Sequence, residues 1–115
     1  MYPPATREIA QARRSLAPES QAAFDAFSRT VFAEGALSAK MKQIVAVAVA
    51  HATQCPYCIK GHTKAALRAG ATRQELMEAI WVAAEMKAGA AYAHSALAIS
   101  VFDEGAAAPS PQARG

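Results

Sequence analysis

The chain has 115 residues, of which 53% are hydrophobic but only 7% aromatic, so it can form one modest, alanine-rich core. The net charge is only +3, and no basic run contains interleaved aromatic residues, which argues against binding to nucleic acid. Residues 1–5 lack the features of a secretory signal, and no uncharged stretch is long and apolar enough to span a bilayer. We therefore expect a cytoplasmic protein with no membrane partner.

Helical patterns dominate the first half of the chain. Residues 6–16 form an amphipathic segment, and Pro18 suits the first turn of a second helix over residues 18–33. Ser38 is a plausible N-cap for a third helix, Ala39–Thr53. Residues 44–50 of this third helix are apolar without interruption. A chain of this size can bury such a helix on all faces only against neighbouring subunits, so the run indicates a homo-oligomer.

The second half of the chain is also helical. Proline disfavours helix at the residue before it, so we expect a break at residue 55 and a new helix over residues 56–69, ended by Gly70. Residues 72–75 have the form of a capping box and open a long helix that continues to about residue 102, with a possible kink at Gly89. Six of its residues are expected to face inward: Leu76, Met77, Ile80, Val82, Ala83 and Met86. We thus predict one all-α domain of five to six helices over residues 1–104 and a disordered tail over residues 105–115.

The chemistry is expected at Cys55, Cys58 and His62. Cys55 precedes the predicted helix that starts at Pro56, where unpaired backbone N–H groups and the helix dipole favour a thiolate. Cys58 follows one turn later, so the two sulfur atoms can form a disulfide. His62 lies a further turn along the same face and can move a proton. In a cytoplasmic protein this spacing indicates redox or metal chemistry rather than a structural disulfide.

Two other interpretations of the cysteines compete with redox catalysis. His51, Cys55, Cys58 and His62 are ligand types that zinc prefers. On a straight helix, however, His51 and His62 would lie about 16 Å apart, so one ion could bind both only if the chain folded back at Pro56. The second alternative is an inert buried pair of cysteines. We favour the redox site and predict no bound metal and no cofactor.

The motifs together resemble the alkylhydroperoxidase D / carboxymuconolactone decarboxylase family, in its cysteine-bearing branch. The similarity covers about residues 37–98, and these segments carry it: Leu37-Ser38-Ala39-Lys40, Lys42-Gln43-Ile44-Val45-Ala46-Val47-Ala48, Cys55-Pro56-Tyr57-Cys58, His62-Thr63 and Ala69-Gly70-Ala71-Thr72.

The resemblance implies an all-α fold, trimers or hexamers, and thiol-dependent peroxidase or disulfide-reductase activity. It implies that Cys58 attacks a small hydroperoxide or disulfide substrate, that Cys55 resolves the product and meets an external dithiol reductant, and that His62 relays protons. Members that decarboxylate carboxymuconolactone typically lack the cysteine pair, so the resemblance makes that activity the alternative.

One position departs from the peroxidase pattern. Gln43 stands where the resemblance implies a glutamate that starts the proton relay, and an amide cannot take up a proton. His51, Glu85 and His94 are candidate substitutes, and burial in an apolar run would raise the pKa of Glu85. A redox-sensing oligomer with little turnover is therefore a further alternative.

Overall fold

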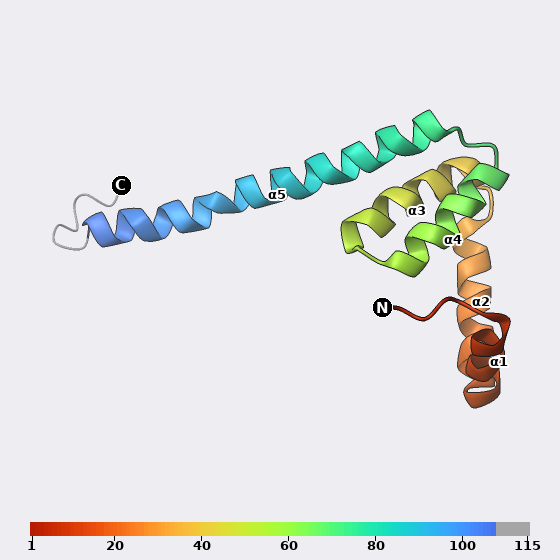
Figure 1. Cartoon of the computed structure of the whole chain (residues 1–115). Coiled ribbons are helices and arrows are strands. Elements are labelled where there is room, and N and C mark those ends of the chain that lie inside the picture. The colour runs from red at the N-terminus through yellow and green to blue at the C-terminus, as the bar shows by residue number, and fades with distance from the viewer. Residues whose placement is uncertain (108–115) are drawn as a thin grey trace.

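The computed structural model describes residues 1–107, and within them it contains five helices and no strand. The helices are α1 (Arg7–Leu16), α2 (Pro18–Phe32), α3 (Ala39–Thr53), α4 (Pro56–Arg68) and α5 (Arg73–Ala107). Their order and type confirm the predicted all-α fold (Figure 1). None of these helices combines the length and the hydropathy needed to cross a bilayer.

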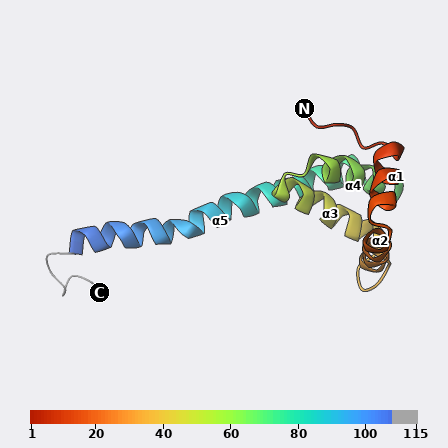
Figure 2. The ribbon, with the colours of Figure 1, turned by 90° about the horizontal axis from the view of Figure 1, so that it is seen from below.

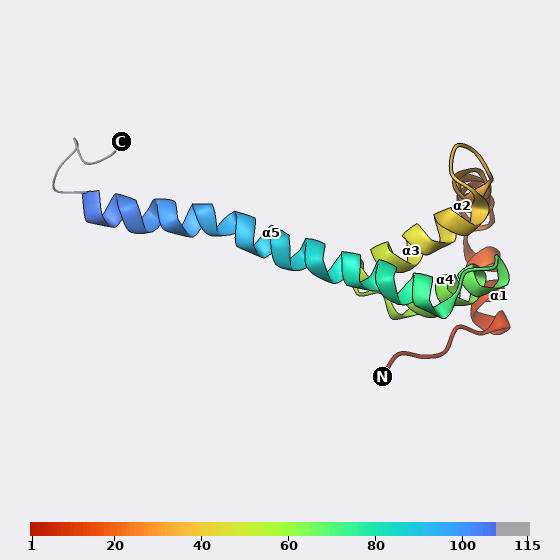
Figure 3. The same cartoon turned by 90° about the horizontal axis from the view of Figure 1, so that it is seen from above.

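The core lies where α3 packs against α4 and against the first part of α5 (Figure 3). Its buried residues come from all three helices and the turn before α5: Ile44, Val47, Ala66, Ala71 and Leu76. Two of the five are alanines, which let the helix backbones approach closely. The core is therefore small, and it fixes α4, with its cysteines, alongside α3.

Sequence signals for helix ends account for the turns around this core. The Ser38 hydroxyl accepts the Met41 N–H at 3.1 Å at the start of α3. Gln54 ends α3 in the left-handed region, at φ 58°, which reverses the chain immediately before Cys55. After α4, Gly70 takes φ 100°, a conformation that suits glycine. The expected capping box forms reciprocally, because Thr72 N–H donates to the Glu75 carboxylate at 2.8 Å and Glu75 N–H donates to the Thr72 hydroxyl at 3.0 Å.

Helices α1 and α2 form an arm to one side of this core (Figure 1). Thr6 caps α1, and α1 packs chiefly on α2. Neither helix contains a buried residue. The arm meets the core through the end of α2, which lies beside α3.

Helix α5 is longer than expected and projects away from the core (Figure 2). It runs through Gly89 without a break and ends at Ala107, so residues 105–107, which the sequence assigns to the tail, are helical. The rest of the expected tail, 108–115, lies outside the described residues. Lys87 donates to the Ala52 carbonyl at 3.1 Å, and beyond this contact α5 continues alone.

Several residues expected to be buried are exposed in the chain. On α5, Leu76 and Ala83 are buried as predicted, whereas Met77, Val82 and Met86 are exposed. The all-round burial expected for α3 depends on neighbouring subunits, and one chain alone buries only one face of this helix. Its buried face holds Ile44, Val47 and Ala50, while Val45 and Val49 are exposed. The physical reason is that one chain supplies helices to cover only one side of α3 and of α5.

Candidate functional site

The two cysteines lie at the turn between α3 and α4. Cys55 is the N-cap of α4, and its sulfur accepts the backbone N–H of Cys58 at 3.3 Å. The two sulfur atoms are 2.7 Å apart. Both residues are partly accessible, and both are free thiols. The geometry therefore places a reactive dithiol at a helix N-terminus, as the spacing predicts.

The surroundings of the two thiols shift their pKa values in opposite directions. The hydrogen bond that the Cys58 thiol donates, supported by backbone N–H groups of Cys58 and Tyr57, lowers the pKa of Cys55. The pKa of Cys58 is raised, first because its thiol donates that hydrogen bond, then by burial and by repulsion from the Cys55 thiolate. Of the two thiols, Cys55 therefore loses its proton more readily. This agrees with the helix-start argument for Cys55, whereas the resemblance gives the attacking role to Cys58.

His62 is held by two contacts from other helices. Its Nδ1 lies 2.8 Å from the Gln43 side-chain oxygen, and its ring stacks on Phe32 at a centroid distance of 5.2 Å. An amide oxygen only accepts, so Nδ1 carries the hydrogen and donates it. The remaining nitrogen, Nε2, is then the proton acceptor. Gln43 therefore fixes the tautomer that makes His62 a base, although it takes up no proton itself.

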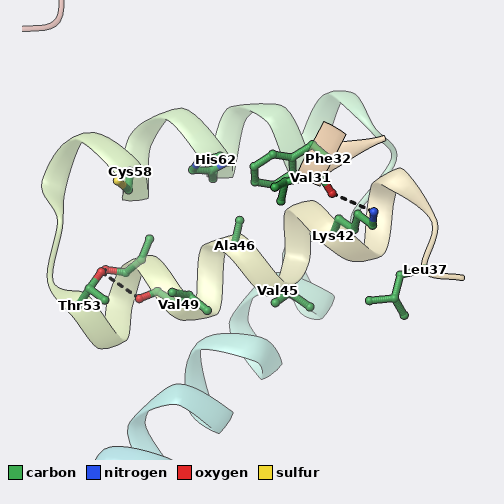
Figure 4. Close-up of a pocket in the computed structure, with 11 residues that line it drawn as sticks. Val31, Phe32, Leu37, Lys42, Val45, Ala46, Val49, Thr53, Cys58 and His62 are labelled. Carbon is green, nitrogen blue, oxygen red and sulfur yellow. Dashed lines mark hydrogen bonds between the residues drawn. The ribbon is translucent and has the colours of Figure 1, made fainter. Parts of the chain in front are cut away.

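Cys58 and His62 both line two pockets, which also share Phe32. The first, of about 420 Å³, is an apolar groove between α3 and α4 (Figure 4). The second, of about 550 Å³, has a more polar rim that includes Gln43, Arg29 and Tyr57. A molecule in either pocket can reach the Cys58 sulfur beside a base.

Tyr57, between the cysteines, makes contacts that support packing rather than catalysis. Its hydroxyl donates to the Pro3 carbonyl at 2.6 Å. Its ring meets that of Tyr2 edge to face, at a centroid distance of 5.8 Å. The N-terminal segment therefore lies against the start of α4, next to the dithiol.

The other candidate relay residues lie elsewhere. The Nδ1 atom of His51 is 2.8 Å from the Val47 carbonyl in its own helix, and His51 lines neither pocket. Glu85 and His94 are exposed on α5, and neither of them lines these pockets. The expected burial of Glu85 is wrong for the single chain, because no helix covers that face of α5. Within residues 1–107, no three His, Cys, Asp or Glu side chains gather as a metal site.

Two residues at the site were given no role there by the sequence. Phe32 stacks on His62 although the two lie 30 positions apart in the sequence, and Lys42 lines the apolar groove at the junction of α2 and α3. Their roles depend on how the arm meets the core. No local motif encodes that arrangement.

Comparison with known proteins identifies related sequences and structures. The sequence pattern of the carboxymuconolactone decarboxylase family matches residues 18–100. An uncharacterised protein of the cox locus of Paracoccus denitrificans is 65% identical over 82 residues, which cover 71% of this chain and 74% of that protein. An uncharacterised protein of Cupriavidus necator is 34% identical over 86 residues, 75% of this chain and 76% of its own length.

Two crystal structures share the fold. A protein from Methanobacterium thermoautotrophicum has a TM-score of 0.68 and 39% identity, covering 74% of this chain and 94% of that one. A carboxymuconolactone decarboxylase family protein from Legionella pneumophila, in its apo form, has a TM-score of 0.66 and 33% identity, covering 86% and 91%. The all-α architecture, the matched pattern and these relatives lead to one conclusion: the chain belongs to the carboxymuconolactone decarboxylase family.

Proposed function

We propose that the protein is a dithiol oxidoreductase that reduces a small hydroperoxide or disulfide and is reset by an external dithiol. One observation carries the proposal. Two sulfur atoms lie 2.7 Å apart at the start of α4, next to a histidine whose tautomer is fixed for proton acceptance. Neither an inert cysteine pair nor a packing histidine requires that arrangement.

The peroxide reaction begins at Cys58, which faces the pockets. His62 Nε2 takes the Cys58 proton, and the thiolate attacks the outer oxygen of the hydroperoxide. The O–O bond breaks, the leaving alkoxide takes the proton that His62 holds and becomes an alcohol, and Cys58 becomes a sulfenic acid. The Cys55 thiolate then attacks the Cys58 sulfur, so a disulfide forms and hydroxide leaves, which becomes water with the proton that Cys55 had earlier given to the solvent. In sum, two thiols and one hydroperoxide give one disulfide, one alcohol and one water.

The low pKa of Cys55 suits exchange with other sulfur compounds. In the reductase direction, the Cys55 thiolate attacks a substrate disulfide and releases one thiol, and Cys58 then displaces the other. In the resetting direction, an external dithiol attacks the Cys55–Cys58 disulfide and is itself oxidised. The peroxide thus reacts first at Cys58, whereas the external dithiol meets the pair at Cys55.

Steady-state turnover tests the proposal. Reduced protein is mixed with hydrogen peroxide or an organic hydroperoxide and with reduced thioredoxin or a lipoyl dithiol as donor. We expect turnover with at least one pair, and its loss in Cys55→Ser and in Cys58→Ser. Unchanged peroxide consumption in Cys58→Ser would reject the mechanism.

The Gln43 position favours a second candidate, a redox sensor with little turnover. Because Gln43 cannot accept a proton, proton transfer out of the site could limit repeated cycles. A sensor would form the disulfide once and reversibly but show no steady-state turnover with any physiological dithiol. The decarboxylation for which the family is named is a separate possibility, distinguished by an activity that survives substitution of both cysteines.

We also propose that the protein works as a homo-oligomer, a trimer or hexamer. The radius of gyration is 21.4 Å, against about 13 Å for a compact chain of this length. The far part of α5 exposes large apolar residues: Tyr92, Leu97, Ile99, Val101 and Phe102. Light scattering should therefore give a multiple of 12.0 kDa. A monomer at micromolar concentration would contradict this proposal.

A further inference from the structure

The groove between α3 and α4 has a chemical polarity along its length (Figure 4). Cys58 and Thr53 lie at one end, and Lys42 and Leu37 lie at the other. Between them the walls are apolar, formed by Val31, Phe32, Val45, Ala46 and Val49. Apolar walls with a few placed polar groups are the usual form of a small-molecule site. The groove therefore suits a chain with a reactive group at one end and a polar group at the other.

Lys42 brings the one full charge among the residues that line the groove, and no carboxylate lines it. Its ammonium donates to the Val31 carbonyl at 2.8 Å and to the Ala33 carbonyl at 2.6 Å. An ammonium has three N–H donors, so one is left over after these two contacts. The two carbonyls hold the ammonium in place before any ligand arrives. An anion in the groove would meet a fixed positive charge.

The other polar groups of the groove are already engaged. The Thr53 hydroxyl donates to the Val49 carbonyl at 3.1 Å, and His62 Nδ1 is paired with Gln43. Lys42 is therefore the group in the groove best placed to select the polar end of a ligand.

We propose that the groove binds an unbranched, medium-chain carboxylic acid whose oxidised group reaches Cys58 while its carboxylate pairs with Lys42. This inference rests on the proposed redox function for its reactive end. Lys42 and Thr53 lie eleven positions apart on α3, about 16 Å at 1.5 Å per residue, which a chain on the order of ten carbons spans together with its polar end groups. The preferred oxidant is thus a hydroperoxide of such an acid rather than hydrogen peroxide.

The test compares straight-chain hydroperoxy acids of increasing length with their methyl esters. In the wild type, kcat/KM should rise by up to roughly fourfold per methylene until the groove is filled. The acid should exceed its ester by roughly tenfold, the effect of one hydrogen bond between charged groups. In Lys42→Met the advantage of the acid over the ester should disappear, mainly through KM. The ester is measured in the same variant, because damage to the fold would lower the rates with acid and ester alike, whereas loss of the charge would lower the rate with the acid alone.

A matched control and a binding measurement keep the inference separate from the proposed function. Lys40→Met removes a lysine of the same helix that pairs with Glu75 at 3.2 Å, and it should leave the preference for acid intact. Calorimetry with decanoate and decanol needs no turnover, so it works even if the peroxidase proposal fails. We expect decanoate to bind more tightly than decanol in the wild type but not in Lys42→Met. Equal use of acid and ester, no binding of decanoate, or the same loss in Lys40→Met would overturn the inference.

Discussion

Replacing Gln43 with leucine isolates the contact that orients the catalytic base. The change keeps the size of the side chain but removes the oxygen that accepts His62 Nδ1–H at 2.8 Å. A neutral hydrogen bond of this kind contributes about 1 kcal/mol, so we expect disulfide formation to slow roughly fivefold. In Gln43→Glu the carboxylate makes a stronger, charge-assisted bond and raises the basicity of His62. There the rate should rise above that of the wild type.

Rapid mixing of reduced protein with a hydroperoxide, followed by acid quenching and thiol counting, measures this step over about pH 5 to about pH 9. Gln74→Leu is the matched control, since Gln74 is exposed at the start of α5. Equal rates in wild type and Gln43→Leu, or the same decrease in Gln74→Leu, would refute the role given to Gln43.

Three further results follow from the same structure. Because the hydrogen bond between the two sulfur atoms lowers the pKa of Cys55, iodoacetamide should alkylate Cys55 at pH values below the usual thiol pKa of about 8.5, and Cys58→Ala should shift the Cys55 titration upward. An unshifted profile would contradict this effect of the hydrogen bond. Val47 is fully buried, so chemical denaturation of Val47→Ala should show a loss of about 2 kcal/mol, against a much smaller loss for the half-exposed Val45→Ala. The Thr72 N–H and then the Lys40 ammonium lower the pKa of Glu75. The wild type should therefore be more stable than Glu75→Gln near neutral pH, and this difference in the free energy of unfolding should decline as the pH falls through about 4.3 and vanish below the lowered pKa of Glu75. A difference that persists in acid would show another origin.

Local signals made most of the fold predictable. Helix α3 has the bounds that its Ser38 cap and following Cys55-Pro56 break indicate, and the capping box starts α5 at the expected place. These features depend on residues within one turn of each other. The same locality explains why the dithiol and its base, all on α4, could be found from spacing alone.

The remaining features depend on tertiary packing, so they could not be predicted from the sequence. The outward exposure of Met77 and Met86 follows from what one chain can cover, which apolar periodicity does not encode. In the same way, the burial of Glu85 was inferred from apolar neighbours in sequence, but those neighbours lie on an uncovered helix face. Gln43 was recognised as a departure from the glutamate pattern, yet its contact with His62 could only be seen in the structure.

The most direct test of the account is the state of Cys55 and Cys58 after one turnover. Fully reduced protein is given one equivalent of an organic hydroperoxide, then analysed by intact mass and peptide mapping, before and after an added dithiol. We predict loss of two hydrogens, an intramolecular Cys55–Cys58 disulfide, one equivalent of alcohol, and full recovery of both thiols with the dithiol. Thiols that stay reduced while the peroxide is consumed, or a stable sulfinic acid on Cys58 with Cys55 still free, would contradict it.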